Sequence, residues 1–141
     1  MLYGGSAYFD GTGDYLTVPS SAAFSFGTGD FTMEAWVYTT SSNTQRIVSV
    51  STNNLEFLLV NTGSNVYLDF YDGVADRTSG SNYVTQNSWQ HVAVARSGTS
   101  LKLFINGVVV GTHTVSTSLP SNPGLTIGRY APSDLQPFFG Y

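Results

Sequence analysis

Short runs of β-branched and aromatic residues recur at regular intervals along the chain, each bounded by Gly, Asn, Asp, Ser or Pro. Such runs predict strands, because branched and aromatic side chains pack well on a pleated sheet and the bounding residues favour turns. The predicted strands are Ala7–Phe9, Tyr15–Val18, Phe31–Thr39, Arg46–Ser51, Leu55–Asn61, Val66–Tyr71, Val74–Ser79, Trp89–Arg96, Leu101–Ile105, Val108–Val115, Leu125–Gly128 and Phe138–Tyr141. Only Ser20–Phe24 favours a helical turn, because a serine stands in a capping position before two alanines. The pattern therefore predicts an all-β fold with minimal helix, an antiparallel sandwich or barrel.

The strongest local signal is the Asn106-Gly107 pair between two apolar runs. Both residues readily take the positive φ angles that a type I′ hairpin turn requires. With Ile105 opposite Val108, one face of the hairpin is apolar and is expected in the core: Leu101, Leu103, Ile105, Val108 and Val110. The other face is mixed and is predicted to meet water: Lys102, Phe104, Val109, Gly111 and His113.

A second hairpin is predicted at Asp72-Gly73, which puts three aromatic or acidic residues on an outward face. A sugar site needs a flat ring for the apolar face of the pyranose and nearby polar groups for its hydroxyls. Tyr67, Asp69 and Tyr71 supply this set and are the predicted ligand-binding residues. In this register Asp69 faces Asp76, so the two carboxylates repel unless water or a cation lies between them.

The two tryptophans, Trp36 and Trp89, are further aromatic candidates, together with Tyr38. Aromatic side chains in a sandwich are core residues more often than ligand platforms, because their burial removes so much apolar surface from water. Both tryptophans are therefore predicted to be buried.

Composition limits the partners that the protein can have. The 141 residues fit one domain, and 41% hydrophobic residues are enough for a packed core. Charged residues make up only 10%, and a formal net charge of −4 with five basic residues offers no electrostatic footprint for nucleic acid or anionic lipid. The chain has no cysteine, no apolar run long enough to span a bilayer, and no secretion signal in its first residues.

Several local sequences follow one another along the chain: Phe9-Asp10-Gly11 with Gly13-Asp14-Tyr15-Leu16, Gly29-Asp30-Phe31-Thr32-Met33-Glu34-Ala35-Trp36-Val37, Trp89-Gln90-His91-Val92-Ala93-Val94, Leu103-Phe104-Ile105-Asn106-Gly107-Val108 and Leu125-Thr126-Ile127-Gly128-Arg129. In this order they resemble the laminin-G-like jelly-roll domains of the concanavalin-A-like lectin and glucanase superfamily. The resemblance covers residues 6–141 and implies one domain, 1–141, made of two antiparallel sheets stacked face to face. It also implies one more strand after Gly140-Tyr141, which this sequence lacks.

Catalytic arrangements are not evident in the sequence. The glucanase branch that the chain resembles carries an acidic triplet along one strand, whereas Glu34 and Glu56 are isolated acids on separate predicted strands. Retaining glycoside hydrolysis needs two carboxylates beside one bond. No Gly-x-Ser-x-Gly elbow occurs, and His91 lies in an apolar run, as a hydrogen-bonded strand histidine would. The prediction is that the protein is not an enzyme.

Calcium is the one cofactor that the sequence suggests. Asp10 and Asp14 lie on either side of a tight glycine turn, and oxygen ligands on loops suit this ion. The alternative is that both aspartates accept hydrogen bonds from backbone amides, as in an Asx-turn.

The predicted function is a non-catalytic module that binds carbohydrate or a surface partner, within a larger extracellular, cell-surface or virion-associated protein. The alternative is a structural domain that contacts copies of itself, and a hydrolase-related enzyme comes third. Self-association is expected through the C-terminal edge, because an unpaired strand with apolar Phe138 and Phe139 would attract another chain.

Overall fold

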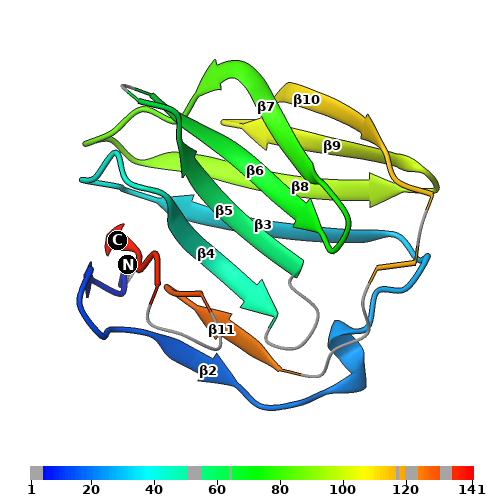
Figure 1. Cartoon of the computed structure of the whole chain (residues 1–141), viewed down its shortest axis with the longest axis horizontal. Coiled ribbons are helices and arrows are strands. Elements are labelled where there is room, and N and C mark those ends of the chain that lie inside the picture. Colours follow the sequence, from blue (N-terminus) through cyan, green and yellow to red (C-terminus); the bar gives the residue numbers. More distant parts are fainter. Residues whose placement is uncertain (1–4, 51–54, 64, 117, 120–123, 131–134) are drawn as a thin grey trace.

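The computed structural model describes residues 5–50, 55–63, 65–116, 118–119, 124–130 and 135–141, and it shows two antiparallel sheets stacked face to face (Figure 1). The four-stranded sheet has the order β10-β9-β8-β3, with β3 (Phe31–Val37), β8 (Gln90–Ser97), β9 (Ser100–Ile105) and β10 (Val108–Thr114). The six-stranded sheet has the order β2-β11-β4-β5-β6-β7, with β2 (Leu16–Val18), β4 (Gln45–Val50), β5 (Leu55–Asn61), β6 (Val66–Asp72), β7 (Asp76–Tyr83) and β11 (Leu125–Ile127). A short pair, β1 (Phe9–Asp10) and β12 (Phe139–Gly140), joins the two ends of the chain. The predicted all-β sandwich is confirmed.

The core lies between the sheets and is built from alternate residues of the central strands. Fully buried side chains come from β5 and β6 on one side and from β8 and β9 on the other: Phe57, Leu59, Leu68, Phe70, Val92, Val94, Leu101 and Leu103. Buried and exposed residues alternate along a strand because successive side chains point to opposite faces of the sheet. The other residues of each strand therefore form the two outer faces of the sandwich.

The predicted strands correspond closely to the observed ones, and β5 has the predicted bounds. The predicted strand at residues 46–51 is found as β4, although Ser51 lies outside the described residues. The helical turn is also found, as the 3-10 helix η1 (Ala22–Phe24) capped by Ser21. Within the described part of the chain, no helix is long and apolar enough to cross a membrane.

The hairpin between β6 and β7 turns at a different place from the one predicted. The central turn residues are Gly73 and Val74, because Asp72 pairs with Ala75 and Tyr71 with Asp76. The Asp72 carboxylate stabilises the turn at Gly73 and Val74, since its Oδ1 accepts hydrogen bonds from the amides of Val74 and Ala75. The shift moves the cross-strand partners by two residues, so every side chain keeps its predicted face.

The hairpin between β9 and β10 has the predicted turn, with Asn106 at φ 52° and Gly107 at φ 79° and with Ile105 opposite Val108. Val108 is nevertheless 65% exposed, and its predicted burial is wrong, because it lies beside the turn on the edge strand of its sheet. A bulge at Val110 then shifts the register.

His113 was predicted on the outer face of the hairpin, and the bulge places it on the inner face instead. One extra residue reverses the faces of everything beyond it. His113 therefore pairs with the inward-facing Leu101, and its Nε2 lies 2.8 Å from the carbonyl oxygen of Thr78 in the facing sheet. The Asn82 amide, from β7, donates to the carbonyl of Val110 at 3.3 Å, so side chains from both edge strands link β7 to β10.

The C-terminal segment is not the unpaired edge that the sequence suggested. Gly140 pairs with Phe9 on one side and with Thr39 on the other, and the backbones of Tyr38 and Tyr141 exchange two hydrogen bonds of 2.7 and 3.0 Å. Phe138 is only 4% exposed and packs edge-on against Phe9. The predicted apolar patch at Phe138 is wrong, because this side chain belongs to the core.

Candidate functional site

Three large aromatic side chains are exposed at the edge of the four-stranded sheet. Trp36 is 64% exposed, Trp89 47% and Tyr141 42%. The predicted burial of both tryptophans is therefore wrong. Trp36 points outward because its neighbours on β3, Ala35 and Val37, face the core, and Trp89 lies just before β8 begins.

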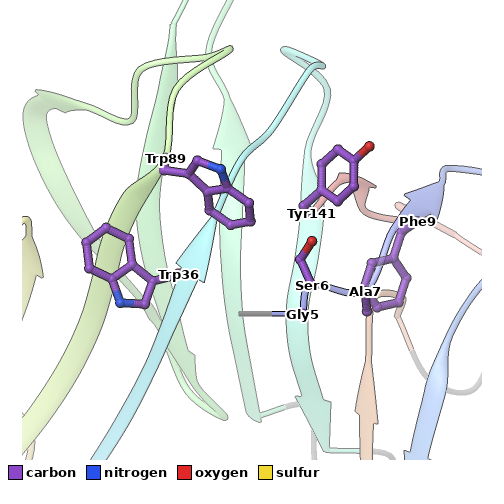
Figure 2. Close-up of a pocket in the computed structure, with 7 residues that line it drawn as sticks. All are labelled: Gly5, Ser6, Ala7, Phe9, Trp36, Trp89 and Tyr141. Carbon is purple, nitrogen blue, oxygen red and sulfur yellow. The ribbon is translucent and has the colours of Figure 1, made fainter. Parts of the chain in front are cut away.

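These three rings surround a hollow of about 640 Å³ (Figure 2). The two indoles lie on one side of it, and the rings of Tyr141 and Phe9 lie on the other, with the backbone near Ser6 between them. The hollow lies beside β3, the edge strand opposite β10 in its sheet. The sandwich thus has linked edges at β7 and β10 and an open, aromatic margin at β3.

Contacts among the rings hold this arrangement in place. Tyr38 lies between the other aromatics, with ring centroids 5.8 Å from Trp89 and 6.1 Å from Tyr141. The rings of Trp89 and Tyr141 are 6.1 Å apart, and Tyr8 packs against Tyr141 at 5.0 Å. Offset and tilted rings at these distances attract one another, so the surface is formed before any ligand arrives.

Two polar side chains adjoin Trp36 on the same outer face. The ring of His91, its cross-strand partner, lies 5.4 Å from the indole. The Nε2 of His91 is 3.5 Å from the Oε2 of Glu34, whose side chain is 64% exposed. Hydrogen-bonding groups therefore stand beside the apolar rings.

The predicted ligand-binding residues lie elsewhere, on the outer face of the six-stranded sheet. Tyr67 packs against Tyr83 at 5.0 Å, and Tyr71 is half-buried. Asp69 is only 2% exposed, and its Oδ1 accepts hydrogen bonds from the amides of Phe70 and Arg77. The three residues share a face as predicted, and their role in binding stays a prediction.

Tyr71 lines a second hollow of about 270 Å³ on this face, which also contains an ion pair. Arg46 Nε lies 2.6 Å from Glu56 Oε2, and the Tyr130 ring covers the guanidinium at 5.4 Å. Burial raises the pKa of Glu56, and the Arg46 charge offsets part of that rise. Burial together with the nearby Asp76 carboxylate raises the pKa of Asp69 to about 6. This face of the molecule thus carries the Arg46–Glu56 ion pair and the carboxylates of Asp69 and Asp76.

The family model described as "Concanavalin A-like lectin/glucanases superfamily" matches residues 10–141 of the chain. The protein belongs to this superfamily. No protein among curated sequences matches it.

Solved structures similar to this concanavalin A-like domain show the same fold at low sequence identity. A candidate carbohydrate-binding protein from Bacteroides ovatus aligns with a TM-score of 0.74 and 17% identity, over 94% of this chain and 40% of that one. Domains LG4-5 of the mouse laminin alpha1 chain align at 0.67 and 16%, over 94% and 37%. Domain 4 of an extracellular arabinanase from Geobacillus stearothermophilus, in complex with arabinotriose, aligns at 0.67 and 17%, over 97% and 72%. The concanavalin A-like domain therefore spans less than half the length of the first two chains.

Glu34 and Glu56, the two acids considered above as candidate catalytic residues, lie in different sheets. In this concanavalin A-like domain, Glu34 lies on the outer face of the four-stranded sheet and Glu56 on the outer face of the six-stranded sheet, with the core between them. Glu34 adjoins His91, and Glu56 pairs with Arg46. These two carboxylates are not placed on either side of one bond.

The turn predicted to hold calcium has both aspartates engaged with backbone amides. Asp10 Oδ1 accepts from the amide of Thr12 at 2.6 Å, and Asp14 Oδ2 accepts from the amide of Asp10 at 3.1 Å. Among the described residues, no three His, Asp or Glu side chains gather as metal ligands. Calcium at Asp10 and Asp14 stays a prediction, which melting curves in calcium and in chelator would test.

Sequence reasoning missed the aromatic hollow, although part of its signal is visible. Trp36 lies two and four residues after Glu34 and Thr32 on β3, so the three side chains share one face of the strand, and the two polar residues mark that face as outward. Tyr141 gave no comparable signal, because its position depends on pairing with Tyr38, far away in the sequence.

Proposed function

We propose that this protein is a non-catalytic carbohydrate-binding module of a larger extracellular protein, and that it binds sugar in the aromatic hollow. The observation that carries the proposal is the exposure of Trp36, Trp89 and Tyr141 around one open hollow. Sandwich domains usually bury such rings, because each removes a large apolar area from water.

The chemistry of the hollow suits a neutral sugar. Flat rings cover the apolar face of a pyranose or furanose, and nearby polar groups orient its hydroxyls. Glu34 and His91 beside Trp36 supply such groups. The protein surface carries few charges, which favours a neutral ligand over an ionic one.

The comparisons support the proposal at the level of the fold. Two of the similar structures are described as a candidate carbohydrate binder and as an arabinanase domain in complex with arabinotriose. The arabinanase is described as extracellular, and laminin domains are also among the similar folds. One fold hosts many functions, so the site itself has to be tested.

A glycan array followed by calorimetry tests the proposal. Trp89→Ala and Trp36→Ala should each weaken binding of the strongest array sugar by at least about tenfold, since aromatic anchors carry much of the energy at such sites. Both side chains are exposed, so melting temperatures should change little.

Tyr71→Ala is the matched control, because it removes an aromatic ring from the opposite outer face. It should leave affinity unchanged. Loss of binding in Tyr71→Ala, with normal binding in both tryptophan variants, would move the site to Tyr67, Asp69 and Tyr71. No array signal, together with dimers or larger species in light scattering, would favour the assembly function instead.

A further inference from the structure

A narrow crevice continues from the floor of the aromatic hollow into the sandwich. It has a volume of about 100 Å³ and shares Phe9, Trp36 and Tyr141 with the hollow above it. Figure 2 shows these three side chains among those that line the hollow. The crevice lies between β3 of the four-stranded sheet and β4 and β11 of the facing six-stranded sheet.

The deeper walls of the crevice are largely hydrocarbon. Val37 and Ala35 come from β3, Ile47 from β4 and Ile127 from β11, while Phe138 lies behind them. Among the residues that the structure describes, no charged side chain lines it. An ionic or strongly polar group would therefore lose its hydration there without a compensating partner.

Two small residues keep the crevice open. Ala35 is the smallest inward-facing residue of β3, between Met33 and Val37. Gly128 lets the Phe9 ring pack against bare backbone, since a Cβ at this position would lie 2.5 Å from the ring. The space is thus set by side-chain size at the open margin of the sandwich.

We propose that the crevice binds a compact apolar substituent of the sugar that occupies the hollow, such as the methyl of an acetamido group or of a 6-deoxy sugar, or a short alkyl aglycone. This inference rests on the proposed function and names the class of saccharide that the site selects. The sugar ring lies on the aromatic surface, and its apolar substituent enters the crevice.

Size and energy set the expected selectivity. An apolar cavity of about 150 Å³ holds benzene, so a crevice of about 100 Å³ holds about four carbon atoms. Each buried methylene tightens binding by about fourfold. Affinity should therefore rise with substituent length and stop rising at about four carbons.

The experiment uses the methyl, propyl, butyl and hexyl glycosides of the monosaccharide that gives the strongest array signal. Calorimetry with the whole chain should show Kd falling from methyl to butyl and levelling off at hexyl. Ala35→Leu fills the crevice and should abolish the dependence on chain length while the methyl glycoside still binds. Ile127→Ala enlarges it and should make the hexyl glycoside the tightest.

Met33→Leu is the control, because Met33 lies on the same face of β3 and outside the crevice. It should keep the wild-type dependence on chain length. A flat series in the wild type, or an unchanged series in both Ala35→Leu and Ile127→Ala, would overturn the inference and leave sugar binding intact. If no sugar binds at all, the proposed function itself is wrong, and the inference is overturned with it.

Discussion

Asp69 shows how a single buried carboxyl group influences the stability of this protein. Its side chain is enclosed on the outer face of the six-stranded sheet, and one oxygen accepts two backbone hydrogen bonds. Burial and the Asp76 charge together outweigh those bonds and raise the pKa to about 6. An unfolded aspartate titrates near 3.9. The folded protein therefore binds a proton more tightly than the unfolded chain does at this position.

Asp69→Asn should consequently change how stability depends on pH. Because the folded pKa is the higher one, the stabilising effect of the proton is complete below about pH 4 and is lost as pH rises through 6. The asparagine keeps an oxygen for the two amides and does not titrate. At pH 7 we expect the variant to be more stable than the wild type by up to about 3 kcal/mol, at about 1.4 kcal/mol per pKa unit.

Chemical denaturation at several pH values from 4 to 8 measures this difference. Asp76→Asn is the companion variant, because it removes the neighbouring charge and should move the transition of Asp69 to lower pH. Parallel stability curves for wild type and Asp69→Asn across this range would contradict the assignment.

The hairpin of β9 and β10 shows what happens at the level of one element. Its turn and the register next to the turn follow from Asn106-Gly107, whose positive φ angles fit the twist of the strands. The bulge at Val110 then turns His113 inward, toward Thr78 of β7. This local irregularity therefore provides one of the contacts that hold the two sheets together at that edge.

Leu103→Ala should destabilise the protein by about 2 to 5 kcal/mol, because Leu103 is fully buried between the sheets. Lys102→Ala should cost less than about 0.5 kcal/mol, since Lys102 is exposed on the outer face. Urea denaturation of both variants measures the two effects, and equal losses would show that the observed register is wrong.

The closure of the chain ends is a property of the whole molecule. β12 brings residues near the C-terminus between β1 and the segment after β3, and the amide of Phe139 donates to the buried Gln45 at 2.9 Å. The same pairing places the Tyr141 ring at the aromatic hollow. The shape of the hollow and the closure of the fold thus depend on one contact between distant parts of the sequence. Self-association of the chain stays a prediction, which light scattering would test.

Gly140→Ala should break this closure. Gly140 has φ 129°, and a Cβ would lie 1.8 Å from the carbonyl oxygen of Tyr38. Gly107→Ala is the matched control, because Gly107 has φ 79° with open space around it. The control should cost about 1 to 2 kcal/mol from backbone strain alone, and Gly140→Ala should cost clearly more. Thermal melting of both variants measures the two losses of stability. Equal losses would mean that β12 contributes little to the stability of the fold.

Much of the fold was predictable because its signals are local. Alternation of apolar and polar residues set the strands to within a few positions, and Asn-Gly set a turn. The turn at Gly73-Val74 was missed by one residue, because a side-chain hydrogen bond from Asp72 decided it. The bulge at Val110 left no comparable signal in the sequence.

By itself, the sequence determined the all-β class, the positions of most strands along the chain, the buried faces of β6 and β9, and the low content of charged residues. These properties depend on side-chain type and on a period of two residues. Only the tertiary structure decided that Trp89 and Tyr141 are exposed beside Trp36 and that a crevice opens between β3 and β11. These features depend on which distant strands become neighbours and on where one sheet stops covering the other, and no local pattern encodes either.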